Sequence, residues 1–460
     1  MKRLLLTATL VLTMFGSASA WPEKYLTGVT TYDAELSYNG YTLWAPQNNT
    51  QKADKPGRSP DEVYLIDMHG NVAHKWNTPY PVWYAQLLKD GTLLVALRTA
   101  LDEKQVPEKD HYSFMGGAFQ ILMEMDWNGK ILRQYKNPGM HHDFKKLKNG
   151  NYLILGWEKI PADFQKKIKG GPSGTELENG TVMYGDRIFE VNPDTGEVVW
   201  NWSSMEHMDP TIEVIGPHYS RSEWTHFNSL DVLENGDIMK DSRRSDAAFI
   251  IDRKTGNIKW RWGNTVYWNE KTNQIDYHFT EEGAELAPYL GGPHDCHVIP
   301  SGLPGGGNML CYDNGMYADR SRAVEVNIKE GKVVWESSGN PFIGRQSFSH
   351  YISSAQRLPN GNTLICDGGN GKFREVTKDN KVVWEYIRPT GNHAYLKWSV
   401  FRAFRYGPDY CPQLKELGDP KRESIDTPDP SQLSVQTVKA NLQVEDNLDE
   451  EEDYGGMKGY

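Results

Sequence analysis

The chain has 460 residues and a formal net charge of −11, with 15 Trp, 24 Tyr and 43 Gly residues. The acidic balance argues against a nucleic-acid partner, because contacts to phosphate need a basic face. Many large aromatic residues together with many glycines are typical of a strand-rich protein with frequent turns. The composition therefore favours an all-β protein that does not bind nucleic acid.

The first twenty residues have the features of a signal peptide. Lys2 and Arg3 form a basic start, Leu4 to Phe15 is an apolar run, and Ala18-Ser19-Ala20 has the small-residue pattern of a cleavage site. This run is too short for a permanent anchor, and no later segment approaches ~18 uninterrupted apolar residues. We expect residues 1–20 to be removed, leaving a periplasmic or secreted protein without a membrane anchor.

Two short sequence patterns, or phrases, alternate along the rest of the chain. The first is an apolar segment, a tight turn and a second strand, with clear copies turning at Gly150, Gly236 and Gly361 and weaker ones at Gly40 and Gly91. Asn-Gly and Asp-Gly between apolar runs are strong hairpin signals. The second phrase is strand, turn and a strand that closes on an aromatic residue. The closing residues are Trp76, Tyr135, Trp200, Trp260, Trp335 and Trp384.

Six such units of four strands predict a six-bladed β-propeller with four antiparallel strands per blade over residues 21–412. The alternative, a stack of β-sandwich domains, is disfavoured by the even spacing of one repeated unit. Because the short turns share one face of the ring, the long connections gather on the other, where function is expected. These connections are 97–118, 157–185, 203–225, 263–293 and 313–321.

Polar residues occupy matched positions where the first strand of each unit starts at the long-loop face. Counting back eight residues from each turn glycine gives Trp83, His142, Asn228, His294 and Ser353. His226 lies two residues before Asn228, on the same face if the strand alternates regularly. The second strand of the fourth unit ends at Asp241-Ser242-Arg243.

This predicted mouth gathers imidazoles, an amide and a guanidinium group. Arginine offers a planar donor fork for an oxyanion, and a neutral imidazole can act as a nucleophile. A single histidine in a propeller is more often structural, and an arginine at a strand end more often pairs with a carboxylate. The convergence of three histidines and an asparagine from three successive units favours a functional site over packing.

Two motifs in this region resemble a known family. The run Glu223-Trp224-Thr225-His226-Phe227-Asn228-Ser229, followed by Asp241-Ser242-Arg243, resembles the Trp-x-His-x-Asn-Ser … Ser-Arg signature of the nucleotide-independent bacterial aryl-sulfate sulfotransferases. The run Gly292-Pro293-His294-Asp295-Cys296, with Tyr312-Asp313-Asn314-Gly315, is similar to their nucleophilic-histidine strand. His142 falls where the family has a further active-site histidine. The resemblance covers roughly residues 60 to 405.

The resemblance implies a six-bladed propeller that moves a sulfuryl group from a phenolic sulfate ester to a phenolic acceptor, with no cofactor and no metal. His294 would attack sulfur in a ping-pong mechanism and form a sulfohistidine. His226, Asn228 and Arg243 would bind the sulfuryl oxygens, and His142, or else His226, would exchange the phenolic proton. The chain differs from the family in carrying an acid, Asp295, beside the nucleophile, and in the closeness of Cys296.

Two other functions remain open. A metal-dependent hydrolase would use imidazole nitrogens as ligands. Its ligands would come from His141, His142, His226, His294 and His297. A non-catalytic propeller would bind a ligand or partner on its loop face, because fold does not fix function. Turnover of an aryl sulfate separates both enzymes from the binding protein.

The cysteines and the C-terminal segment complete the set of expectations. Cys296 and Cys311 flank one hairpin and are expected to form a disulfide, which leaves Cys366 and Cys411 for a second. Disulfide formation in an exported protein implies a thiol-oxidising partner. Residues 413–460 are poor in aromatics and contain an acidic run at 450–453, so we expect a disordered tail.

Overall fold

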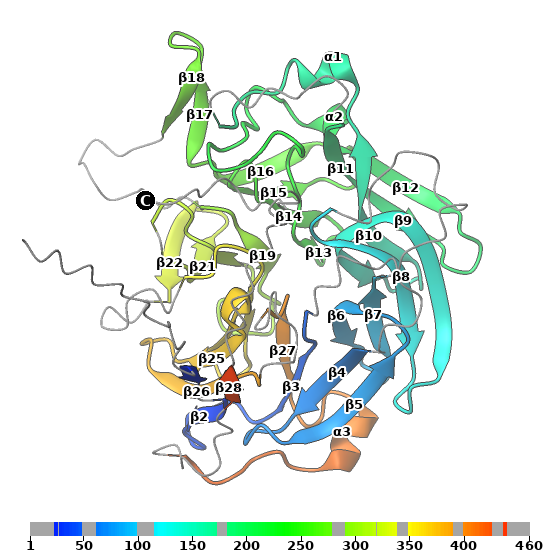
Figure 1. The fold of residues 1–460 in the computed structure, drawn as a ribbon, viewed down its shortest axis with the longest axis vertical. Helices are drawn as coiled ribbons and strands as arrows, with labels where there is room; N and C mark the ends of the chain where they lie inside the picture. Colours follow the sequence, from blue (N-terminus) through cyan, green and yellow to red (C-terminus); the bar gives the residue numbers. More distant parts are fainter. Residues whose placement is uncertain are drawn as a thin grey trace, which may run out of the picture.

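The computed structural model describes residues 23–25, 27–47, 61–98, 115–172, 182–277, 290–318, 320–337, 348–389, 399–425 and 436–438. Antiparallel strands dominate this part of the chain, and their sheets surround a common centre in an all-β, propeller-like arrangement (Figure 1). The α-helices described are short, and none is long and apolar enough to cross a membrane. They are α1 (Ala162–Gln165), α2 (Ser204–His207) and α3 (Pro412–Leu417).

Four sheets match the predicted repeat of strands joined by tight turns. The turn glycines Gly236 and Gly361 have φ of 88° and 92°, which a residue with a side chain rarely adopts. Two sheets are β13 (Leu230–Val232), β14 (Ile238–Ser242), β15 (Ala247–Ile251) and β16 (Ile258–Gly263), then β19 (His294–Val298), β20 (Met309–Asp313), β21 (Arg322–Asn327) and β22 (Lys332–Glu336). A third is β23 (Ser354–Arg357), β24 (Thr363–Asp367), β25 (Lys372–Val376) and β26 (Val382–Ile387), with β2 (Gly28–Tyr32) added at its edge.

The remaining predicted units form one continuous sheet of seven strands rather than separate sheets of four. Its strand β9 (Ile131–Lys146) is 16 residues long; one end pairs with β8 and the other with β10. Met140 and His141 pair with both neighbours, and the register with β8 shifts between Phe119 and Ile121. The other strands are β6 (Val82–Leu87), β7 (Leu93–Leu97), β8 (Ala118–Met125), β10 (Tyr152–Lys159), β11 (Tyr184–Val191) and β12 (Val198–Ser203).

The ring is closed by strands from opposite ends of the chain. The fourth four-stranded sheet begins with β27 (Ala403–Tyr406), which pairs with β3 (Tyr41–Trp44) and is followed by β4 (Asp61–Ile66) and β5 (Val72–Thr78). The repeat in the sequence does not reveal β27, because it lies beyond the last Asn-Gly turn. A separate hairpin, β17 (Val266–Asn269) and β18 (Gln274–Tyr277), stands within the connection 263–293.

Tryptophans at the ends of the sheets link each sheet to the next. The indole nitrogen of Trp76 donates to the Asp126 carbonyl at 3.1 Å, and that of Trp384 donates to the Met68 carbonyl at 2.9 Å, which joins the last sheet to the first. Trp260 and Trp335 make equivalent bonds. In the third unit the bonding residue is Trp202, not the predicted Trp200. Each bond satisfies an indole N–H while the ring packs; the bond is buried for Trp202 and Trp384 and exposed for Trp335.

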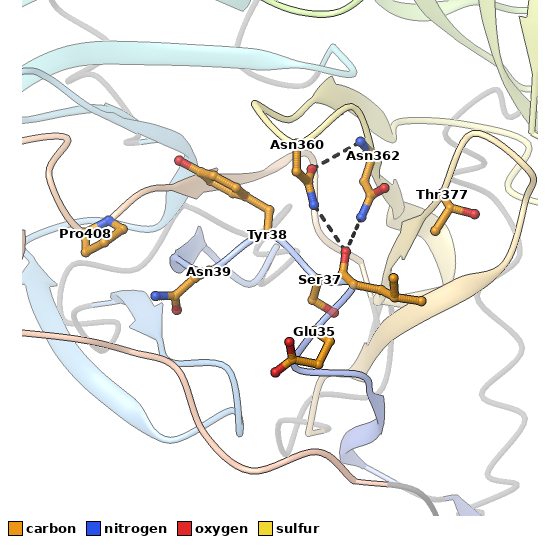
Figure 2. A pocket seen from close by; sticks show the side chains of 9 residues that line it. Glu35, Ser37, Tyr38, Asn39, Asn360, Asn362, Thr377 and Pro408 are labelled. Carbon is orange, nitrogen blue, oxygen red and sulfur yellow. Dashed lines mark hydrogen bonds between the residues drawn. The ribbon is translucent and has the colours of Figure 1, made fainter.

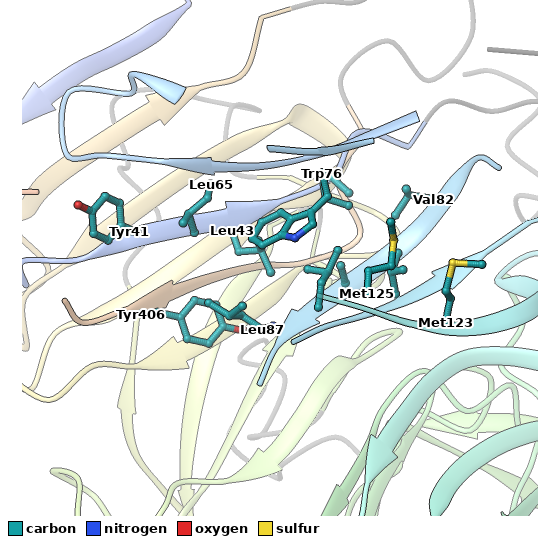
Figure 3. Close-up of a cluster of buried hydrophobic side chains, with 14 of the residues drawn as sticks. Tyr41, Leu43, Leu65, Trp76, Val82, Leu87, Met123, Met125 and Tyr406 are labelled. Atoms are coloured by element: carbon teal, nitrogen blue, oxygen red, sulfur yellow. Dashed lines mark hydrogen bonds between the residues drawn. The ribbon is translucent and has the colours of Figure 1, made fainter. Parts of the chain in front are cut away.

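The hydrophobic core is divided among clusters between neighbouring sheets. Figure 3 shows one of them, in which Trp76 packs beside Leu43 and Leu65 of the first sheet and Met123 of the next. All four side chains are buried. The cluster also contains Tyr406 from the closing strand, so the strand that closes the ring also contributes to this core.

The cysteines confirm one predicted pair and contradict the other. Cys296 and Cys311 form a disulfide across β19 and β20, with Cα atoms 4.0 Å apart. Cys366 and Cys411 are free and buried. They lie in different hydrophobic clusters, because Cys366 belongs to β24 while Cys411 caps α3. The second disulfide prediction is therefore wrong.

Part of the segment expected to be a disordered tail is ordered. Leu414 of α3 is buried, and the Tyr410 hydroxyl just before the helix donates to the Leu87 carbonyl at 2.9 Å. Ile425 bonds back to Tyr32, and β28 (Gln436–Val438) pairs with β1 (Glu23–Tyr25). Apolar residues within 413–425 therefore extend the folded body. The predicted signal peptide and the acidic run 450–453 lie outside the described residues.

Candidate active site

The five residues expected in the site lie at strand ends of neighbouring sheets, and all are buried. His142 belongs to β9, His294 begins β19, and Arg243 follows β14 directly. His226 and Asn228 precede β13. Since β13 contacts both β9 and β19, these side chains come from adjoining inner strands.

The backbone turns left-handed where these inner strands begin. His142, His226 and Asp295 have φ of 49°, 51° and 54°. Non-glycine residues seldom adopt this conformation, and such strained positions collect at functional sites. Thr225 is also left-handed, with φ of 79°, and β13 begins only at Leu230. Regular alternation therefore does not hold at residues 225–228, so it cannot place His226 and Asn228 on one face.

The orientation of His294 is fixed by Asn314. The Asn314 Nδ2 group donates to the carbonyls of Ser349 and Ile352, at 2.7 Å and 3.0 Å, so its Oδ1 atom must face the imidazole. His294 Nδ1 lies 2.7 Å from this Oδ1 atom and therefore carries the proton. The opposite nitrogen, Nε2, is left with a lone pair, which accepts a bond of 3.0 Å from the Ile352 backbone N–H.

His294 is held in its neutral form. Burial lowers the pKa of His294 well below its ordinary value, and the positive charge of Arg243 lowers it further. Asn314 and the Gly292 carbonyl oppose this shift only in part. A buried neutral imidazole whose Nε2 atom carries the lone pair is suited to nucleophilic attack once that atom exchanges the Ile352 N–H for a substrate.

His226 is paired with a buried carboxylate that its motif contained but that had no predicted role. His226 Nδ1 contacts Glu223 Oε2, and Arg244 Nη2 lies 3.6 Å from the same oxygen. Burial alone would raise the pKa of Glu223, but the charges of His226 and Arg244 lower it to about 2. Glu223 is therefore ionised and orients the imidazole of His226.

His142 lies against His226, with ring centroids 4.6 Å apart. On its other side, His142 Nδ1 is 2.9 Å from His141 Nδ1. Burial and the neighbouring charges of His226 and His141 lower the pKa of His142 well below its ordinary value. Trp157 stacks on His141 with centroids 3.9 Å apart.

Arg243 has few partners. Its guanidinium lies 4.9 Å from the centre of the Tyr219 ring, and Nη2 donates a long bond of 3.5 Å to the His350 carbonyl. The Nε atom is buried without a hydrogen-bond partner. Whereas Arg244 lies near Glu223, Arg243 forms no ion pair with any described carboxylate. Unpaired buried donors are unusual and are suited to an incoming anion.

Asn228 is tied to the strand that carries the nucleophile. Its Nδ2 atom donates to the Pro293 carbonyl at 3.0 Å, and its backbone N–H donates to Asp241 at 2.9 Å. Its Oδ1 atom is buried with no hydrogen-bond partner. In this structure Asn228 therefore bonds to the peptide next to His294.

Arg402 is a central residue that sequence reasoning missed. Its Nη1 and Nη2 atoms donate to Asp143 Oδ2 and to the Asn228 carbonyl, both at 2.8 Å, and Nε lies 3.3 Å from Asp295 Oδ1. These partners adjoin or include His142, Asn228 and His294. The charge of Asp295, the acid next to His294, is thus compensated by Arg402.

A separate cavity of about 490 Å³ lies at turns of the first and last sheets (Figure 2). The side chains of Asn360 and Asn362 close one side of it by donating to the Leu36 carbonyl at 3.2 Å and 2.8 Å. None of the five predicted site residues lines this cavity. Among the described residues, no group of three or more His, Cys, Asp or Glu side chains is arranged to hold a metal ion.

Comparisons with known proteins follow from this geometry. A family model described as Arylsulfotransferase (ASST) matches residues 47–400. Comparison with curated protein sequences gives no match. A solved protein of unknown function from Bacteroides caccae aligns at 14% identity with a TM-score of 0.44, over 80% of this chain and 98% of that one. A catalytically inactive virginiamycin B lyase from Staphylococcus aureus aligns at 11% identity and 0.36, over 79% and 88%.

Proposed function

Because the chain belongs to the arylsulfotransferase (ASST) family, we propose that it moves a sulfuryl group from an aryl sulfate to a phenol through a sulfohistidine at His294. The observation that carries this proposal is the bond between His294 Nδ1 and Asn314, which leaves Nε2 as the nucleophilic nitrogen. Family membership supports arylsulfotransferase activity in general; the ping-pong path is our inference from this geometry.

In the first half-reaction the Nε2 lone pair forms a bond to sulfur while the bond from sulfur to the aryl oxygen breaks. The electron pair leaves with the phenolate. In the second half-reaction the oxygen of an acceptor phenol attacks the same sulfur, the N–S bond breaks, and the acceptor proton passes to a base. Covalent catalysis of this kind divides one difficult transfer into two similar ones.

The neighbouring residues support these steps. The unpaired guanidinium of Arg243 is the donor we assign to the sulfuryl oxygens, with His226 beside it. His142, held neutral by burial, is the base that we assign to the acceptor phenol. Asn228 reaches a sulfuryl oxygen only by giving up its bond to Pro293, so we assign it chiefly to holding the nucleophile strand.

The nucleophile can be identified directly. Replacing His294 by Asn should abolish phenol release, including the first turnover, because no imidazole remains to attack sulfur. Brief exposure of the wild-type protein to an aryl sulfate should add one sulfuryl group to the peptide that contains His294, detectable by mass spectrometry at alkaline pH. Wild-type turnover in the variant would overturn the mechanism.

The same assay separates the alternatives. With donor alone, phenol release should stop near one equivalent of enzyme, and a second phenol should restore turnover. Steady release that ignores the acceptor would favour a hydrolase, and no release would favour a binding protein. A matched control is His297→Asn, because His297 is only part-buried and bonds to the Asp295 carbonyl at 2.8 Å.

We also propose that the ring has six blades, with β9 shared by two of them. What supports this number is that β9 pairs with both β8 and β10, so the seven-stranded sheet divides into two four-stranded units that share β9, beside the four other sheets of the ring. An experimental structure of the ring would decide it by the number of blades around the axis.

Export and oxidation complete the proposal. The basic start, apolar run and Ala18-Ser19-Ala20 support cleavage after residue 20, and the Cys296–Cys311 pair supports a thiol-oxidising partner in the same compartment. N-terminal sequencing of the mature protein should begin at Trp21. An uncleaved N-terminus in protein from the exported fraction would contradict this.

A further inference from the structure

We propose that His141 and Asp186 form a buried relay with His142 that determines which nitrogen of His142 carries a proton, and so lets His142 exchange the phenolic proton. The inference rests on the proposed function. It assigns positioning roles to His141 and Asp186. The family resemblance gives neither residue a role, and His141 was named above only as a possible metal ligand.

Three side chains from two strands make a continuous line. His141 and His142 are consecutive in β9, and Asp186 lies in β11. His141 Nδ1 is 2.9 Å from His142 Nδ1, and His141 Nε2 lies at an ion-pair distance of 3.2 Å from Asp186 Oδ1 without the alignment of a hydrogen bond. The side chains of His141 and Asp186 are both 0% exposed, so water does not compete for these contacts.

Asp186 is held in place by two donors. It accepts the backbone N–H of Phe227 at 3.1 Å and the hydroxyl of Thr225. Its Oδ1 atom faces His141 Nε2 and so favours a proton on that nitrogen. Trp157 stacks on the His141 ring and prevents it from turning away.

The proton on His141 Nε2 dictates the state of His142. In neutral His141 the other nitrogen, Nδ1, is an acceptor, so His142 must donate from its own Nδ1. His142 Nε2 is then a free lone pair. Its edge faces Gly117, where a Cβ would lie 2.2 Å from Nε2, so a side chain at that position would cover the nitrogen.

The charges around His142 make the relay necessary. The groups that act on His142 directly are His226, His141, His294 and Arg402, and each disfavours a positive charge on it. Glu223 lies beyond His226, and Asp186 lies beyond His141. A proton that reaches His142 can therefore be compensated only by carboxylates one ring away.

The proton balance closes over a full cycle. When the acceptor phenol attacks sulfur, its proton passes to His142 Nε2, and the Nδ1 proton of His142 passes to His141, whose imidazolium then faces Asp186. In the next donor half-reaction the protons move back, and His142 Nε2 protonates the departing phenolate. No external acid or base is consumed.

The test is Asp186→Asn, with His141→Asn as a second variant. Losing the relay should slow transfer to weakly acidic phenols by ~10²-fold, the usual contribution of general acid–base catalysis, but should barely affect acceptors that are already ionised. The acid limb of the pH profile for acceptor transfer should also move. The control Glu158→Gln alters a buried-edge carboxyl that bonds to Ser203 and should leave both unchanged. An equal loss with all acceptors would overturn the relay in favour of a purely structural role.

A second readout does not depend on activity. Nitrogen-15 chemical shifts of the histidine imidazoles should show His142 protonated at Nδ1 in the wild-type protein and mixed tautomers in Asp186→Asn. A tautomer that is unchanged in the variant would overturn the relay. Failure of the wild-type protein to transfer sulfate would instead overturn the proposed function, and the tautomer would still decide the relay.

Discussion

Arg402 and Arg243 are both buried in the middle of the ring, yet their surroundings are opposite. Arg402 contacts the carboxylates of Asp143 and Asp295 and the carbonyl of Asn228. Arg243 packs on Tyr219, keeps an unpaired Nε and forms no ion pair with a described carboxylate. The charge of Arg402 is thus neutralised by carboxylates of the protein itself. The charge of Arg243 has no such partner and is available to an anionic ligand.

The difference shows that the protein retains an energetically unfavourable buried charge at Arg243. A buried charge without a counter-charge destabilises a fold unless a ligand compensates it. Burial lowers the pKa of His294 most and Arg243 lowers it further, so the unpaired charge helps to keep the proposed nucleophile neutral. One residue therefore prepares both the anion site and the nucleophile.

The largest effect should follow from Arg402→Met. Removing the guanidinium leaves Asp143 and Asp295 as uncompensated buried carboxylates, which typically costs about 3–5 kcal/mol of unfolding free energy. Chemical denaturation should detect this loss together with the loss of sulfate transfer. A variant as stable as wild type would show that these acids are not held by Arg402.

Arg243→Met should affect activity and not stability. Loss of one transition-state donor typically lowers the rate by ~10²–10³-fold. The unfolding free energy should stay the same or rise, because an uncompensated charge is removed. Steady-state kinetics and denaturation on the same sample test the predicted rate and the predicted stability. Destabilisation as large as that of Arg402→Met would show that the two arginines do not differ in their structural role.

Arg243→Lys should give a smaller effect. Lysine keeps the charge but lacks the planar donor fork, so about one charged hydrogen bond is lost. A loss of about 1.5 kcal/mol corresponds to a roughly tenfold lower rate. A loss as large as that of methionine would mean that geometry, not charge, carries the role of Arg243.

The smallest effect should be a shift in pH dependence. Burial lowers the pKa of His294, and Arg243 adds to this, so removing Arg243 should raise that pKa toward its ordinary value. Since protonation of His294 removes the nucleophile, the acid limb of the donor half-reaction should move to higher pH in Arg243→Met. The pH profile of the first phenol burst measures this, and a limb that does not move would show that the charge does not reach His294.

The two arginines also show which site residues could be predicted from the sequence and which could not. Arg243 lies in a local motif next to an Asn-Gly hairpin, and the Asp313-Asn314-Gly315 motif begins at the end of β20, the strand that pairs with β19, so short-range patterns identified both. Arg402 directly precedes β27, whose partner β3 is far away in the chain, and no local signal predicts such a pairing. Asp186 was missed for the same reason, since its partners come from β9 and from residues 225–227.

Local backbone strain explains a second kind of miss. Side-chain alternation applies to regular strands, but the left-handed residues Thr225 and His226 interrupt it just before β13. The continuous β9 likewise departs from the repeat, because no turn separates its two halves. Patterns therefore predicted the regular elements well and failed where the backbone changes conformation at the site.

The position of the closing strand β27 in the sequence determines when the site can be completed during synthesis. β27 and Arg402 are made after every other residue discussed in the site, so a growing or half-translocated chain already carries His294 but lacks the group that ties its strand to those of His142 and Asn228. Sulfate transfer should consequently appear late and abruptly, when the last strand docks. A partly made chain would then have little opportunity to react with the wrong phenol.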